Sequence, residues 1–272
     1  MQVEITDAHR EELRAAMMLL EYPGIAAKIT DFIGMPIQKA LDLLPKNWNE
    51  KIGVITRTAL LKASDAAIFT MKNKQGGKAS NAWHKVGVAV TGGVGGFFGF
   101  AALAVELPVS TTIMLRSIAD IARSQGESIA DYETKLACME VFALGGTSIA
   151  DDNSESGYYA VRLSLVTSVS EVVGYVTKTL SDKSSPALIK FISSIAQRFG
   201  IQISEKVAAQ AIPAIGAAGG VIINTIFINH FQDMARGHFT VRKLERIYGK
   251  DAVKACYDGL LQSSMSRKNQ KF

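Results

Sequence analysis

The side chains that could perform acid–base or metal chemistry are few and scattered along this sequence. Asp151 and Asp152 could act as general acid or base groups, but adjacent residues point in different directions, and capping of the following helix explains them better. His230 and Asp233 are three residues apart and could share a helix face, yet no further acidic or histidine ligand stands at a matching spacing. We therefore expect no metal site and no cofactor.

The short motifs of common catalytic sites are also missing. The sequence contains no HExxH, GxSxG or CxxC motif and no Walker glycine–lysine loop. Gly93-Val94-Gly95 begins like a dinucleotide-binding fingerprint, but Phe98 occupies the third glycine position and no strand is predicted before it. Cys138 and Cys256 are too far apart in the sequence to form a disulfide framework or a metal cluster, which is typical of a reducing compartment.

Several polar residues interrupt apolar stretches and are therefore candidates for binding a ligand or a partner. Arg162 and Glu171 stand within an otherwise apolar helical pattern, and a buried charge needs a partner. Arg116 has Asp120 four residues later, so a helix-surface ion pair is the simpler interpretation there. The candidate binding residues are Glu106, Arg116, Arg162, Glu171, Asn224, His230 and Arg242.

Two segments carry no formal charge: residues 86–105, which are twenty residues, and residues 207–232, which are twenty-six with His230 counted as neutral. Gly92 and Gly96 are four residues apart, a spacing that recurs in both segments and places glycines on one helix face, where another backbone can approach closely. Twenty apolar residues can also cross a hydrocarbon core of about 30 Å. Two interpretations stay open: helices buried inside a bundle, or helices inserted in a membrane.

Positive charge is concentrated at the C-terminal end. Residues 236–272 contain nine Lys or Arg and three acidic residues, whereas the remaining 235 residues contain 21 basic and 22 acidic ones. Such an end suits an anionic membrane surface, at about 1 kcal/mol per basic residue near it. A solvated, solubilising tail is the alternative, and the lack of interleaved aromatic residues argues against nucleic acid as a partner. The candidates for membrane contact are Arg242, Lys243, Arg246 and Lys250.

The elements that must position these residues are predicted to be helices, because apolar residues recur at intervals of three and four. The stretch after residue 155 is rich in Val and Thr and could form a strand on propensity, but its spacing favours a helix. We expect an all-α bundle of about ten helices with two long, apolar, glycine-rich segments. It forms a single domain over 1–272, with N-terminal helices in 1–48 and basic helices and a tail in 236–272. The predicted helix breaks are at Pro23, Pro45, Gly76-Gly77, Pro108, Gly126, Gly145-Gly146, Pro186, Gly200 and Gly249.

Composition places the chain between ordinary soluble and membrane proteins. Its hydrophobic fraction is 48% and its mean hydropathy is +0.15, but 20% of the residues are charged, too many for a transporter made mostly of membrane helices. The N-terminus does not show a basic start followed by an apolar stretch, as a secretory signal would. We expect a cytoplasmic protein, peripheral to the inner face of the cell membrane.

Three stretches, in a fixed order, resemble the EcsC protein family of bacteria. They are Glu-Leu-Pro at 106–108 followed by LRSIADIA at 115–122, AIPAIGA at 211–217 leading to Asn224, and HFTVRKLERIYG at 238–249. The resemblance covers roughly residues 50–260. It implies a bacterial protein that is often associated with the membrane and is encoded in some genomes beside an ABC transporter. Members are sometimes labelled peptidases, but this sequence supplies no nucleophile, base or metal site to support that label.

The sequence therefore predicts a non-enzymatic, membrane-associated protein that binds lipid or a membrane-protein partner through its glycine-spaced helices and basic end. One alternative is a hydrolase with an unrecognised site built around Glu106, Arg162, Glu171 and His230. Another is a carrier of an apolar small molecule, in which the glycines leave a cavity between helices.

Overall fold

The computed structural model describes residues 4–22, 24–64, 99–146, 157–176, 186–212 and 215–269. Within these ranges the chain forms ten α-helices and one 3-10 turn, without a strand, so the predicted all-α fold of about ten helices is confirmed. The elements are α1 (Asp7–Glu21), α2 (Ile25–Ile33), α3 (Ile37–Leu41), α4 (Trp48–Ala63), α6 (Gly99–Ser124), α7 (Tyr132–Glu140), η2 (Val141–Ala143), α8 (Gly157–Val176), α9 (Pro186–Gln210), α10 (Gly216–Tyr248) and α11 (Lys250–Asn269).

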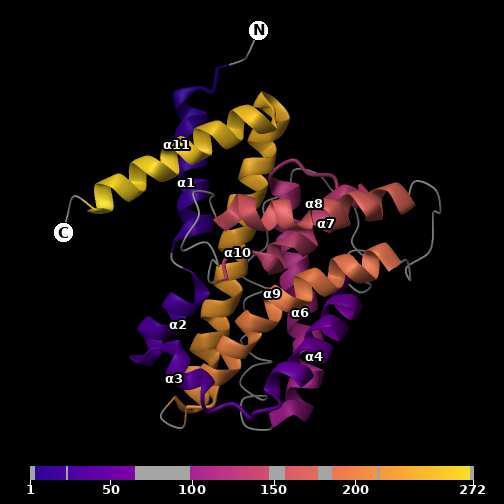
Figure 1. Cartoon of the computed structure of the whole chain (residues 1–272), viewed down its shortest axis with the longest axis vertical. Coiled ribbons are helices and arrows are strands. Elements are labelled where there is room, and N and C mark those ends of the chain that lie inside the picture. Colours follow the sequence, from indigo (N-terminus) through magenta and orange to yellow (C-terminus); the bar gives the residue numbers. More distant parts are fainter. Residues whose placement is uncertain are drawn as a thin grey trace.

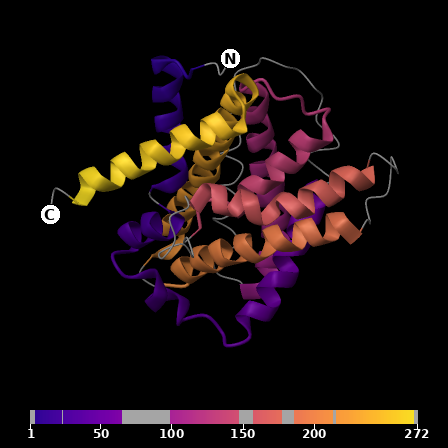
Figure 2. The ribbon, with the colours of Figure 1, turned by 45° about the horizontal axis from the view of Figure 1, so that its top comes forward.

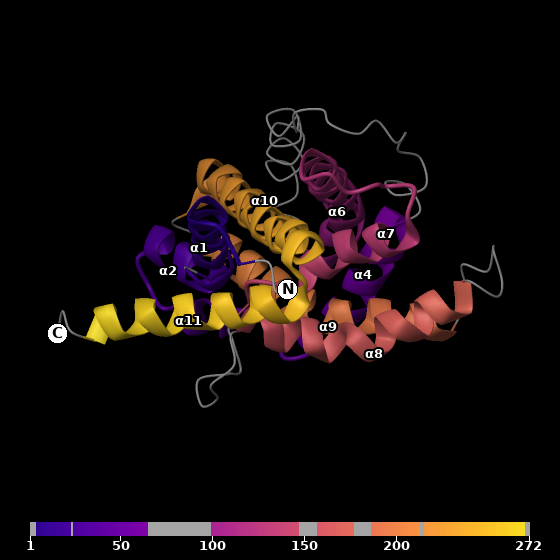
Figure 3. The same cartoon turned by 90° about the horizontal axis from the view of Figure 1, so that it is seen from above.

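The long helix α10 is the centre of the bundle. It contacts α1, α2, α6, α9 and α11, and Figures 1 and 3 show it running through the molecule between α1 on one side and α6 on the other. Helices α8 and α9 pack side by side and extend away from this centre (Figure 2). Four buried phenylalanines join α10, α9 and η2, with ring centroids 4.8 Å apart for Phe142 and Phe199, 5.3 Å for Phe142 and Phe231, and 5.0 Å for Phe227 and Phe231.

Helix α1 begins after a threonine cap. The Thr6 side chain accepts a hydrogen bond from the His9 backbone N–H at 3.4 Å, and Asp7 lies in the first turn, where a helix dipole favours an acid. The buried face of α1 packs against α10 at a glycine: a Cβ at Gly237 would lie 2.6 Å from Leu20 Cγ and 3.0 Å from the Ala16 carbonyl oxygen. Only a glycine allows the two helices to approach this closely.

Two predicted helix breaks are wrong, because tertiary packing overrides the local preference. Helix α6 runs through Pro108, and α9 runs through Gly200. Pro108 deprives the Ala104 carbonyl of its helical donor, but the buried residues on either side of it, Leu107 and Ser110, hold the helix in the core. A buried glycine costs a helix only about 1 kcal/mol relative to alanine, which the packing of α9 against α4 outweighs.

The second charge-free segment is divided between two helices, and the first is described only at its end. Residues 207–232 form the last turn of α9 and the first half of α10. A Cβ at Gly220 would meet no described atom within 4 Å, so the close helix approach expected of this segment occurs further along α10, at Gly237. Gly92 and Gly96 lie outside the described residues. The first of the basic helices predicted in 236–272 is not a separate element, since α10 continues through this region to Tyr248.

Among the described residues, one helical stretch is long and apolar enough to cross a membrane by length and composition alone. It is Ala102–Ser124 of α6, with a mean hydropathy of 1.3, and half of it is buried inside the bundle. A core helix satisfies the same criterion, so this stretch is compatible with both of the interpretations that the sequence leaves open.

Candidate functional site

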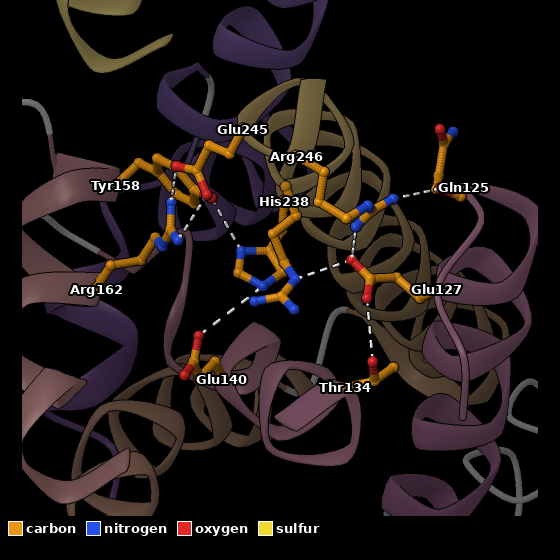
Figure 4. A network of polar contacts seen from close by, with 10 residues as sticks. Gln125, Glu127, Thr134, Glu140, Tyr158, Arg162, His238, Glu245 and Arg246 are labelled. Atoms are coloured by element: carbon orange, nitrogen blue, oxygen red, sulfur yellow. Dashed lines mark hydrogen bonds and ion pairs between the residues drawn. The ribbon is translucent and has the colours of Figure 1, made fainter. Parts of the chain in front are cut away.

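The C-terminal half of α10 carries an extended network of polar contacts (Figure 4). His238, Arg242, Glu245 and Arg246 follow one another at helical spacing, so their side chains leave the helix toward neighbouring elements. We call these residues and their partners from the α6–α7 turn, α7 and α8 the α10 network. It has three parts, centred on Glu127, on Glu245 and on His238.

Glu127 holds the turn after α6 against α10. It follows Gly126, whose φ of 83° is the left-handed conformation that ends α6. Its buried carboxylate accepts hydrogen bonds from Arg242 Nε at 3.0 Å, from Thr134 Oγ1 at 3.0 Å and from Arg246. Burial alone would raise the pKa of Glu127, but the bond from Arg242 and the charges of both arginines outweigh it and lower that pKa. Glu127 is therefore an ionised, structural acceptor.

Glu245 provides the partner that the sequence requires for Arg162. The guanidinium of Arg162, on α8, donates to the Glu245 carboxylate through both terminal nitrogens, at 2.6 and 3.0 Å. The same guanidinium lies 5.4 Å from the centroid of the Tyr158 ring and 5.6 Å from that of Tyr159. A two-pronged, largely buried pair of this kind fixes the orientation of α8 relative to α10.

His238 lies between a phenol and a carboxyl group in the interior. Its Nδ1 is 3.0 Å from the Tyr158 hydroxyl, and its Nε2 is 3.9 Å from Glu140 Oε2, beyond hydrogen-bond reach. Burial lowers the pKa of His238 well below its usual value, and burial raises the pKa of Glu140 despite the nearby arginines. The imidazole is therefore neutral at neutral pH. Among the described residues, Nδ1 bonds only to the Tyr158 hydroxyl and Nε2 has no hydrogen-bond partner, so no serine, threonine or cysteine is hydrogen-bonded to this imidazole.

A second polar cluster lies where α6, α9 and α10 meet. Lys206 Nζ donates to Glu106 Oε1 at 2.9 Å, and the ammonium lies 5.4 Å from the centroid of the Phe227 ring. One turn further along α9, Gln210 donates to Asn224 Oδ1 at 3.3 Å. We call Glu106, Lys206, Gln210 and Asn224 the Lys206 cluster. It brings together two of the candidate binding residues, Glu106 and Asn224, around a lysine that the sequence analysis did not single out.

His230 has a packing role at a tight turn. Gly145 has a φ of 70°, and a Cβ there would lie 2.4 Å from the His230 ring. Gln202 Nε2 donates to the adjacent Leu144 carbonyl at 2.8 Å. Burial, and secondarily the charge of Lys28, lowers the pKa of His230 to about 3. The neutral imidazole therefore packs directly against the turn. In the part of the chain that is described, no group of three or more His, Cys, Asp or Glu is placed to hold a metal ion.

The other candidate residues are dispersed over the surface. Glu171 forms an exposed ion pair with Lys190 at 3.2 Å, Arg116 is exposed on α6, and Lys250 is exposed at the start of α11. Lys243 donates to Glu12 at 2.6 Å. With Arg242 and Arg246 bound to Glu127, three of the four candidates for membrane contact are engaged in ion pairs within the bundle.

The residues proposed for a hydrolase site do not form one. Glu106 pairs with Lys206, Arg162 with Glu245, and Glu171 with Lys190, while His230 packs on Gly145. No hydrogen bond or ion pair between described residues joins any two of these four candidates. Three of them form ion pairs with other residues and the His230 ring packs against Gly145, so the geometry does not favour the hydrolase alternative.

Two central residues of these clusters escaped the sequence analysis. Glu127 stands in an ordinary polar turn, and its arginines are 115 and 119 positions away. Lys206 borders the second charge-free segment, and that position was the only sequence signal that could have drawn attention to it.

Comparison with protein families bears out the resemblance seen in the three ordered stretches. The model of the EcsC protein family matches residues 11–244. The matched range includes the whole Lys206 cluster and all of the α10 network except Glu245 and Arg246. Comparison with curated proteins and with solved structures found no significant match. The chain belongs to the EcsC protein family.

Proposed function

We propose that this protein is a non-enzymatic, membrane-associated protein that binds lipid or a membrane-protein partner at the inner face of the cell membrane. One observation carries the proposal. Val105 and Val109 lie one turn apart on α6, with 71% and 46% of their surfaces exposed, directly at the end of the charge-free segment 86–105. An exposed apolar face on a helix of this composition suits contact with acyl chains or with another apolar helix.

The division of α6 into two halves supports this assignment. Its C-terminal half is anchored, since Met114, Leu115, Ile118, Ala119 and Ile121 are all buried. Its N-terminal half also buries Leu103 and Leu107, but it turns Val105 and Val109 outward. One face of this half is therefore open to contact with a membrane interface while the opposite face stays packed in the bundle, which gives reversible rather than permanent attachment.

The basic C-terminal end contributes through its net charge in this proposal. Residues 236–272 carry nine basic and three acidic residues, an excess of six. Arg242, Lys243 and Arg246 serve the fold through Glu127 and Glu12, so their neutralisation would test stability before it tested binding. The net positive charge of residues 236–272 attracts anionic lipid without a specific contact, and salt weakens this attraction. The apolar contact of α6 is the second contribution to binding.

The experiment compares two pairs of exposed apolar residues in a vesicle sedimentation assay. Val105→Ser/Val109→Ser should reduce binding to anionic vesicles at least tenfold. Leu163→Ser/Val166→Ser is the matched control, because these α8 residues are equally exposed, at 62% and 52%, and should leave binding unchanged. Equal losses in both variants, or no binding by the unmodified protein at low salt, would contradict the proposal.

A further inference from the structure

Two buried side chains of the Lys206 cluster keep hydrogen-bond donors that no atom of the described residues accepts. The Lys206 ammonium is 1% exposed and can donate three bonds, yet in the described chain Glu106 is its one acceptor. Asn224 is 0% exposed. Its Oδ1 accepts from Gln210, and its Nδ2 has no partner. Such unpaired donors are rare in a protein interior, because each one loses its bonds to water without replacement.

The residues that carry these donors lie on facing sides of α9 and α10, at successive levels of the crossing. Lys206 and Gln210 are one turn apart on α9, and Asn224 and Phe227 are nearly one turn apart on α10. Contacts cross between the two helices at both levels, from Lys206 to the Phe227 ring and from Gln210 to Asn224. Figure 1 shows α9 crossing α10, with which it is in contact.

The charge of the cluster determines what kind of acceptor it can take. The positive charge of Lys206 is already matched by Glu106 at 2.9 Å. A second buried anion would have no compensating charge to offset the loss of its hydration. An uncharged oxygen, such as a carbonyl, accepts from both donors without that cost. The Phe227 ring beside Lys206 is apolar and buried, as are Leu107 and Ile223, the sequence neighbours of Glu106 and Asn224, so the rest of a ligand must be apolar too.

We propose that the Lys206 cluster binds the carbonyl group of an uncharged, acyl-bearing ligand between α6, α9 and α10. The unpaired donors of Lys206 and Asn224 hold the carbonyl oxygen. The Glu106 side chain is 9% exposed, and Gln210, which is half-buried, is the member of the cluster through which a ligand would approach from the surface. This site lies inside the bundle and goes beyond membrane association, which depends on the outer face of α6.

Thermal unfolding of the full-length protein, without vesicles, tests the proposal with three probes of equal chain length. A 1-monoacylglycerol has the carbonyl, a 1-O-alkylglycerol lacks it, and a fatty acid replaces it with a charge. We expect the monoacylglycerol, at a hundredfold excess over its Kd, to raise the Tm by about 5 °C. The other two probes should raise it much less.

Two variants locate the effect, and one matched variant controls for it. Glu106→Leu/Lys206→Met replaces the buried pair with apolar residues of similar size, a change that folds commonly tolerate. It should abolish the shift, as should Asn224→Leu. Glu171→Leu/Lys190→Met changes an exposed ion pair on α8 and α9 and should retain the full shift. If no probe raises the Tm, if all three raise it equally, or if both cluster variants keep the shift, the donors bind internal water only and the proposal is wrong.

Discussion

Arg242 on α10 donates to the Glu127 carboxylate at 3.0 Å and thereby joins two parts of the chain that are 115 residues apart. Arg246, one turn later, donates to the same carboxylate and to the Gln125 carbonyl. The basic residues that a linear reading assigns to the membrane thus have a structural role. They hold the turn between α6 and α7 against the central helix.

Removal of Glu127 should destabilise the fold. Glu127→Ala leaves the largely buried Arg242 without its acceptor, which should lower the free energy of unfolding by about 2–3 kcal/mol. Glu171→Ala removes an acid of an exposed ion pair and should cost less than about 1 kcal/mol. Urea unfolding of both variants measures the difference. Equal losses would show that Glu127 does not lock the turn.

The turn at Gly145 should tolerate no side chain. Gly145→Ala must place a Cβ about where the His230 ring lies and must also keep a φ of 70°, so we expect a loss of about 3 kcal/mol or more. Gly34→Ala is a matched control with a φ of 69° and no atom within 4 Å of the new Cβ. It should cost only about 1–2 kcal/mol of backbone strain. Similar losses in urea unfolding would mean that the contact with His230 is unimportant.

His230 should make stability depend on pH. Its folded pKa is about 3 and its usual value is 6.5, so between these values the unfolded chain binds a proton that the folded chain does not. The free energy of unfolding is therefore unaffected by His230 above pH 6.5 and decreases as the pH falls from 6.5 toward 3, because protonation then favours the unfolded chain. The free energy of unfolding of the unmodified protein should therefore fall more steeply between pH 6.5 and 4.5 than that of His230→Leu. Parallel curves would contradict a buried, neutral His230.

The class of the fold was predictable from periodicity, but several helix boundaries were not. Apolar spacing and the Thr6 cap predict α1, and the spacing of residues after 155 correctly favours a helix over a strand for α8. Pro108 and Gly200 are local helix breakers, and the local pattern contains no information on the packing of α6 and α9 that overrides them. The family was recognisable from three short stretches, and the match extends further toward the N-terminus than those stretches do.

The candidate sites were predictable as polar residues in apolar surroundings, but their partners were not. Glu106, Arg162 and Asn224 were found because a charge or an amide stands out in an apolar run. Their partners, Lys206, Glu245 and Gln210, are brought to them only by the crossing of α9 and α10 with other helices. Helical spacing identifies the neighbours on one helix face, whereas the pairing between helices 80 to 100 residues apart depends on the complete fold.

Membrane association is the central claim, and fractionation of cells that produce the full-length protein tests it most directly. Lysates are separated at low salt, and the pellet is washed with high salt and then with a mild detergent. We predict that the protein sediments with membranes, that salt releases a part of it by screening the basic end, and that detergent releases the rest by displacing the apolar contact of α6. Recovery of the whole protein in the low-salt supernatant would contradict the account and would identify Val105 and Val109 as ordinary exposed residues of a helical bundle.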